Sequence, residues 1–154
     1  MIKNHKSMIW FVTSGLLAAG LCASYLEWRP VLIVGIHHRS SGFSDVLVTS
    51  LPLSDKAKIR WWLNHQDEIK DLYNVPAPEP DGTFDVTFWR FGEGYKEEGQ
   101  HDCLCFDDMR IKARCIEKNS IFEVSNSRNY GLVFESGKSR YRLVKNGDIE
   151  KFDW

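Results

Sequence analysis

The sequence lacks the short motifs that mark the common classes of small enzyme. It has no G-x-S-x-G nucleophile elbow, no H-E-x-x-H zinc motif, no phosphate-binding loop and no dinucleotide-binding glycine pattern. It also lacks internal repeats, long Gly/Ser stretches and long runs of one charge sign. We therefore assign no catalytic residue, expect no cofactor and no bound metal, and favour a non-catalytic role over an enzymatic one.

An excess of positive charge is absent as well. The chain has 20 Lys and Arg residues against 21 Asp and Glu residues, for a formal net charge of −1. Proteins that bind DNA or RNA neutralise phosphates with basic surfaces, so nucleic acid is not expected as a partner. With 43% hydrophobic and 13% aromatic residues, the chain has enough apolar surface to fold into a domain.

Charged side chains are missing from the whole stretch between Ser7 and Leu26. This run of ~20 residues, at ~1.5 Å of helical rise each, matches the ~30 Å hydrocarbon core of a bilayer. Lys3 and Lys6 precede it, and the positive-inside rule keeps such an end in the cytoplasm. The run therefore predicts a membrane-spanning helix that places the rest of the chain across the membrane.

The predicted protein sits in the inner (cytoplasmic) membrane with a single span. It divides into a cytoplasmic N-terminus over residues 1–6, a transmembrane signal-anchor helix over residues 7–28 and a periplasmic α+β domain over residues 29–154. A cleaved signal peptide and a lipoprotein modified at Cys22 are the alternatives. We favour the uncleaved anchor because Leu21 is a poor residue before either processing site.

Three cysteines, Cys103, Cys105 and Cys115, fall in the exported part, where an oxidising compartment favours disulfides. Cys103 and Cys105 are poorly placed to pair with each other along a strand, and either one could reach Cys115. We favour a Cys105–Cys115 disulfide that leaves Cys103 as an odd thiol. A zinc site that adds His101 competes with this interpretation, but the single-residue spacing fits structural zinc poorly.

The hydrophobic pattern predicts one amphipathic helix over Asp55–Tyr73, capped by Ser54 or Asp55 and ended before Pro76. Strands are predicted at 30–36, 45–49, 83–91, 103–106, 121–124, 131–135, 140–144 and 149–152. A polar loop is predicted over 92–99, and 107–118 is left between a short helix and an irregular segment. The predicted fold class is α+β: an N-terminal single transmembrane helix, then an antiparallel sheet packed with one main amphipathic helix.

Six segments of the chain are distinctive: RPVLIVGIHH, SDVLV, LPLSDKAKIRWWLNHQDEIKDLYNVP, FGEGYKEEG, LCFDDM and CIEKN. Together they resemble a family described as small enterobacterial membrane proteins and known only as domain-of-unknown-function family 943. The resemblance covers essentially the whole chain and implies an envelope location, but it implies no reaction. The family pattern centres on Cys105 and Cys115, and Cys103 departs from it.

Trp61 and Trp62 are the first candidates for a contact surface. Neighbouring helical side chains point ~100° apart, so the two indoles cannot both be fully buried. We predict Trp62 in the core and Trp61 as a partly exposed contact anchor. Trp89 and Tyr95, on and after a strand, are predicted to extend that surface.

His37 and His38 are the candidate catalytic side chains, with Asp45 near them as an orienting carboxylate. Adjacent strand residues face opposite sides of a sheet, so at most one histidine can serve a site. We favour plain strand-end roles for both histidines. Asp107 and Asp108 are interpreted as solvated loop acids rather than as calcium ligands.

The predicted role is recognition of an envelope protein, of the inhibitor or immunity type, by a domain tied to the membrane through the N-terminal helix. One alternative is a small periplasmic hydrolase that uses one of His37 or His38. Another is a thiol or metal sensor that uses Cys103.

Overall fold

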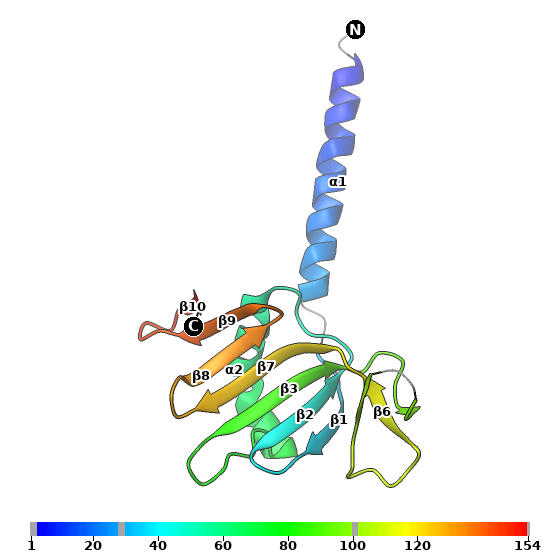
Figure 1. Ribbon diagram of the computed structural model, residues 1–154. Coiled ribbons are helices and arrows are strands. Elements are labelled where there is room, and N and C mark those ends of the chain that lie inside the picture. Colours follow the sequence, from blue (N-terminus) through cyan, green and yellow to red (C-terminus); the bar gives the residue numbers. More distant parts are fainter. Residues whose placement is uncertain (1–2, 28–29, 100–101, 154) are drawn as a thin grey trace.

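The computed structural model describes residues 3–27, 30–99 and 102–153, and within the first helix it describes the side chains at 10–22, 24 and 25 (Figure 1). Helix α1 spans Lys3–Glu27 and extends away from the sheet (Figure 1). Among the residues that the structure describes, no helix is long and apolar enough to cross a membrane. Two sequence-based assignments, Trp28 in the anchor and His101 in the zinc set, lie outside the described residues.

A large twisted sheet forms the body of the domain, in the strand order β1-β2-β3-β7-β8-β9-β10 (Figure 1). Its strands are β1 Ile33–His38, β2 Phe43–Val48, β3 Phe84–Arg90, β7 Ser120–Ser127, β8 Gly131–Ser136, β9 Ser139–Leu143 and β10 Ile149–Phe152. The α+β class is as predicted, but the sheet is not purely antiparallel, because β2 and β3 run parallel. The helix that follows β2 carries the chain back to the starting end of that strand, so the next strand repeats its direction.

Helix α2 spans Asp55–Tyr73, the range that the hydrophobic pattern predicts. Ser54 caps it, since the Ser54 hydroxyl accepts a hydrogen bond from the Ala57 amide at 3.3 Å. Asn74 ends it in the left-handed conformation, with φ of 55°. The helix covers one face of the large sheet, which we call the helix face (Figure 1).

The main core lies between α2 and the helix face. Its buried side chains come from the helix and from β2, β3, β7 and β8, with Trp62, Phe88, Phe122 and Phe134 as the largest. A hydrogen-bond network fixes the start of α2 on the sheet. Asp55 accepts hydrogen bonds from the Ser136 hydroxyl at 2.6 Å and from the Tyr141 hydroxyl at 2.7 Å. Burial acts to raise the pKa of Asp55, but these hydrogen bonds and Lys58 outweigh it and leave that pKa lowered.

A second, smaller sheet lies against part of the opposite face, which we call the open face. It has the order β4-β6-β5, with β4 Lys96–Glu97, β5 Cys103–Cys105 and β6 Ala113–Glu117. Leu47, Phe106 and Ile116 form the buried core between the two sheets. The predicted polar loop over 92–99 thus contains β4, and the ambiguous segment 107–118 contains β6. The two residues of β4 carry no alternation pattern, so this strand is recognisable only through its pairing with β6.

Candidate functional site

The three predicted contact residues do not form one surface. Trp61 is half-buried on the helix side and meets Phe88 edge-to-face, with ring centroids 5.8 Å apart. Trp89 and Tyr95 pack in the smaller core on the open face, beneath the small sheet. The large sheet therefore separates Trp61 from the other two side chains. A sequence pattern indicates which side of its own helix or strand a residue occupies. It does not show on which face of the sheet that helix packs, so it could not place Trp61 relative to Trp89 and Tyr95.

Trp61 lines a groove of about 970 Å³ between α2 and the start of β1. We call it the α2–β1 groove. Its walls are formed by residues 30–33, Pro52, Ala57, Arg60, Trp61, Asn64, His65, Glu68, Ile69, Leu72 and Tyr73. The groove thus follows the whole length of the helix on one side.

The helical repeat arranges the groove residues of α2 in two rows, because side chains four apart lie above one another. The inner row is Trp61, His65, Ile69 and Tyr73, and the outer row is Arg60, Asn64, Glu68 and Leu72. His65 stiffens the inner row: its Nδ1–H donates to the Trp61 carbonyl at 2.7 Å, and its ring stacks on the indole at 5.3 Å. The groove therefore has a mainly aromatic and apolar floor beside an outer wall that is polar except at Leu72.

Strand β1 is the edge strand beside the groove. Within the described residues it pairs with β2 on one side, and no strand pairs with its outer edge. Two apolar side chains are exposed here: Val34 within β1 is 42% exposed, and Leu32, just before the strand, is 57% exposed. An exposed apolar edge strand can accept a further strand, and natural proteins usually protect such an edge. The register shift at Val34, between Ile33 and Gly35, is the kind of irregularity that protects an edge.

His37 lies opposite Asp45 in the β1–β2 register, but its ring bonds elsewhere. Nδ1 is 2.8 and 2.9 Å from the two carboxylate oxygens of Asp108, and Nε2 is 2.8 Å from the Tyr95 hydroxyl. Burial and the Asp108 charge raise the pKa of Tyr95, so the phenol stays protonated beside the imidazole. The ring also stacks on Phe106, with centroids 3.7 Å apart. Asp108 is an exposed residue of a turn, as predicted for a loop acid, but the sequence did not reveal its pairing with His37.

Asp45 has partners of its own and does not orient a histidine. This fully buried carboxylate forms an ion pair with Arg39 at 2.7 Å and accepts a hydrogen bond from Trp89 Nε1 at 2.8 Å. His38 points to the other face, as strand alternation requires, and contacts the Tyr73 carbonyl at 3.2 Å. Both ring nitrogens of His37 contact protein groups, so His37 joins β1 to the segments that flank the small sheet.

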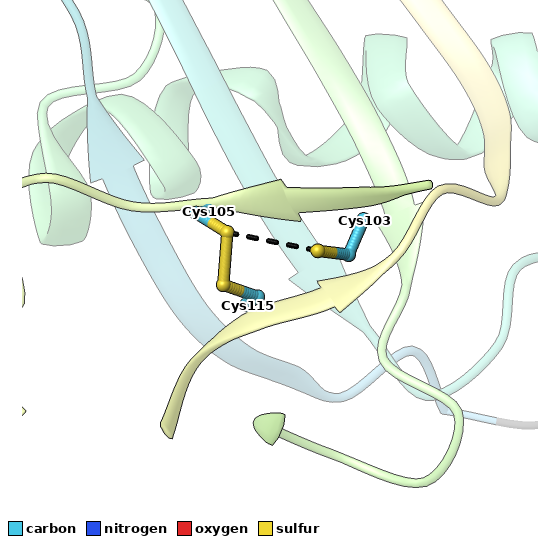
Figure 2. Close-up of side chains that lie close together, drawn as sticks. All are labelled: Cys103, Cys105 and Cys115. Carbon is cyan, nitrogen blue, oxygen red and sulfur yellow. Dashed lines mark hydrogen bonds between the residues drawn. A yellow bond between two sulfur atoms is a disulfide. The ribbon is translucent and has the colours of Figure 1, made fainter. Parts of the chain in front are cut away.

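The sulfur atoms of Cys103, Cys105 and Cys115 meet between β5 and β6 (Figure 2). Cys105 and Cys115 face each other in the antiparallel register and are joined by a disulfide, the pair that the sequence favours. Cys103 is a free thiol, and its Sγ lies 3.7 Å from Cys105 Sγ. Cys115 is fully buried, whereas Cys103 and Cys105 are half-buried at the surface of the small sheet.

Sequence reasoning missed a pair of carboxyl groups on the open face. Glu123 of β7 and Asp85 of β3 are hydrogen-bonded neighbours, half-buried on adjacent strands. Burial, with the charges of Asp85 and Glu135 added, raises the pKa of Glu123 to about 7. Burial also raises the pKa of Asp85. The alternation within each strand indicates that each acid lies on the more polar side of its own strand. Only the strand order of the sheet shows that the two acids are neighbours.

A family model described as "Enterobacterial putative membrane protein (DUF943)" matches residues 2–153 of the chain. The chain belongs to this family. Comparisons with curated proteins and with solved structures gave no match.

Membership in DUF943 extends from α1 to the last strand, so the groove, the sulfur cluster and the carboxyl pair all lie within the family's domain. The family's description names a membrane protein and no reaction. The site must therefore be interpreted from its own chemistry. By size and by exposed apolar surface, the α2–β1 groove is the strongest candidate for the functional site.

Proposed function

We propose that this DUF943 protein is a single-pass inner-membrane protein whose periplasmic domain binds another envelope protein in the α2–β1 groove. The anchor is supported by the uncharged run Ser7–Leu26, by Lys3 and Lys6 before it, and by the family's description as a membrane protein. The binding role is supported chiefly by one observation: a groove with an apolar floor meets the start of edge strand β1, whose outer edge has no strand partner in the described part of the chain.

The proposed occupant is an extended segment of the partner that adds to the outer edge of β1. Strand addition supplies affinity through main-chain hydrogen bonds, and pockets for alternate side chains supply specificity. The floor formed by Trp61, His65 and Ile69 offers such a pocket. Tryptophan is enriched among the residues that contribute most to protein interfaces.

The charged side chains of the outer row favour one orientation of the bound segment. Arg60 and Glu68 stand at two points of the outer row, about 12 Å apart along the helix axis at ~1.5 Å per residue. A segment with an acidic side chain near Arg60 and a basic one near Glu68 complements this wall. Recognition of this kind suits an inhibitor or immunity-type protein that captures one specific partner at the membrane.

Topology is tested with alkaline phosphatase fused to the carboxy terminus. The proposal expects an active fusion that stays with the membrane after salt and carbonate washing. An active fusion found only in the soluble periplasmic fraction indicates a cleaved leader and removes the anchor. An inactive fusion, with a cytoplasmic reporter active at the same position, removes the periplasmic location.

Binding is tested by site-specific photocrosslinking in intact enterobacterial cells. A photoreactive residue at Leu72, in the groove, is compared with one at Tyr130, an equally exposed side chain outside the groove. The proposal expects one protein crosslinked from Leu72 alone, through a segment that mass spectrometry can map. A synthetic peptide of that segment should bind the purified chain at least about tenfold more weakly after Trp61→Ala, and unchanged after Tyr130→Ala.

The double charge reversal Arg60→Glu with Glu68→Arg tests the direction of the bound segment. The double variant should bind the natural peptide more weakly than wild type does. It should regain affinity for a peptide in which the two flanking charges are exchanged. Equal crosslinking from Leu72 and Tyr130, or equal peptide affinity of wild type and Trp61→Ala, would contradict the groove as the binding site.

A further inference from the structure

The three cysteines of the small sheet place their sulfur atoms within 4.8 Å of one another. Two of these residues oppose each other across β5 and β6, and Cys103 lies two positions along β5 on the same side as Cys105. Figure 2 shows the Cys103 thiol directed at the disulfide. We propose that, once the disulfide is reduced, Cys103, Cys105 and Cys115 together bind one Cu(I) ion.

The donor set selects the metal. Three thiolates form a soft ligand set, and soft sulfur ligands favour Cu(I). At a metal–sulfur distance of ~2.3 Å, three sulfurs in a trigonal plane lie ~4.0 Å apart, by the metal–thiolate length typical of proteins. The 3.7 Å between the sulfurs of Cys103 and Cys105 is close to this spacing, and reduction of the disulfide frees the sulfurs of Cys105 and Cys115 to separate toward it.

Zinc fits this cluster less well because structural zinc takes four ligands. Among the described residues, no further His, Cys, Asp or Glu joins the three sulfurs. The short spacing between Cys103 and Cys105, which argues against a zinc knuckle in the sequence, is no obstacle to three-coordinate Cu(I). The third ligand comes from the neighbouring strand rather than from the same loop.

The redox step balances with a dithiol as the reductant. The dithiol is oxidised to its own disulfide and passes two electrons and two protons to the Cys105–Cys115 bond, which becomes two thiols. Cu(I) then displaces the three thiol protons without any electron transfer. The disulfide and the copper site are mutually exclusive, so the oxidised protein holds no copper.

The test uses the full-length chain in detergent, reduced with a phosphine and desalted without oxygen. Cu(I) is titrated against bicinchoninate, whose coloured complex reports the copper that the protein does not hold. The proposal expects one Cu(I) per reduced chain, an ultraviolet sulfur-to-copper absorption band, and no uptake by the oxidised chain.

Cys103→Ser is the diagnostic variant, because it can still form the Cys105–Cys115 disulfide and so fold in the same way. It should bind Cu(I) at least about tenfold more weakly than wild type. Cys22→Ser, which removes a thiol in α1, is the matched control and should bind as wild type does.

Three results would overturn the proposal. These are copper affinity in Cys103→Ser equal to that of wild type, no copper withdrawn from bicinchoninate by the reduced wild type, and loss of copper in Cys22→Ser. Near-ultraviolet circular dichroism checks the fold of the reduced chain. A reduced chain that loses its tertiary signal and does not regain it with Cu(I) also counts against the proposal.

Discussion

Glu123 and Asp85, on neighbouring strands β7 and β3, share a hydrogen bond on the open face of the sheet. Two neighbouring carboxylates repel each other when both are charged. The pair therefore keeps a proton at pH values where an exposed carboxylic acid has lost its own. Glu135 stands opposite Glu123 on the next strand, and Arg140 of β9 contacts Glu135 at 2.7 Å. The open face thus carries a band of interacting polar groups where the helix face carries apolar ones.

The first prediction concerns pH. An acid whose pKa is higher in the folded state than in the unfolded state binds more protons when folded, so its contribution to stability falls as the pH rises. For Glu123 this fall should extend from about 4.5, its ordinary value, to about 7. Glu123→Gln, which keeps the hydrogen bond without the charge, should make the chain more stable than wild type at pH 8 and flatten this part of the profile.

Urea unfolding curves at a series of pH values measure this effect. Glu150→Gln, on the exposed strand β10, is the control and should leave the slope unchanged. A Glu123→Gln profile that still falls between pH 5 and pH 7 as steeply as the wild type would show that another group is responsible.

The second prediction separates the two neighbouring tryptophans. Trp62 is 1% exposed and fills the main core, so Trp62→Ala should cost about 3–5 kcal/mol of unfolding free energy. Trp62→Phe should cost far less, because the Trp62 Nε1 donor has no hydrogen-bond acceptor among the described residues. Trp61→Ala should cost about 1–2 kcal/mol, since Trp61 is half-buried and loses its contacts with Phe88 and His65.

Thermal and urea unfolding of the three variants rank these costs. A Trp61→Ala variant as unstable as Trp62→Ala would make Trp61 a core residue. Any loss of peptide binding in that variant would then reflect unfolding rather than a lost contact.

The third prediction concerns the disulfide. Peptide mapping without reductant should recover Cys105 linked to Cys115 and Cys103 alkylated by iodoacetamide. The two residues are 10 positions apart, and closing a loop of this length stabilises the folded state by about 2–3 kcal/mol in the chain-entropy model. Cys115→Ser should therefore lower stability by about that amount, whereas Cys103→Ser should have little effect. A Cys103–Cys115 peptide in the map would refute this pairing.

The fourth prediction tests His37 as the connection between the two sheets. His37→Ala removes the contacts to Asp108 and Tyr95 and the stacking on Phe106, and should cost about 2–4 kcal/mol. Hydrogen exchange should quicken most in β5 and β6. His38→Ala, on the exposed neighbour, should cost less than about 1 kcal/mol. Uniformly faster exchange throughout the large sheet would contradict a local connecting role.

Local signals in the sequence were sufficient for the elements whose stability is local. The helix Asp55–Tyr73 carries its own cap, its own apolar stripe and its own stop, so its predicted bounds match the structure. The strand Ile149–Phe152 likewise follows a turn signal and was placed correctly. The two-residue strand Lys96–Glu97 has no such signal, because it exists only through its pairing with β6.

Residue composition and spacing by themselves determined the uncharged N-terminal run, the α+β class, the amphipathic helix and the three closely spaced cysteines, because each depends on neighbours within a few positions. Tertiary structure alone decided that His37 bonds Asp108 rather than Asp45, that Trp61 and Trp89 lie on opposite faces, and that Glu123 meets Asp85. These outcomes depend on strand order and on how the small sheet packs against the large one. Both depend on the apolar surface buried between segments that are far apart in the sequence, and a local sequence pattern carries no information about such contacts.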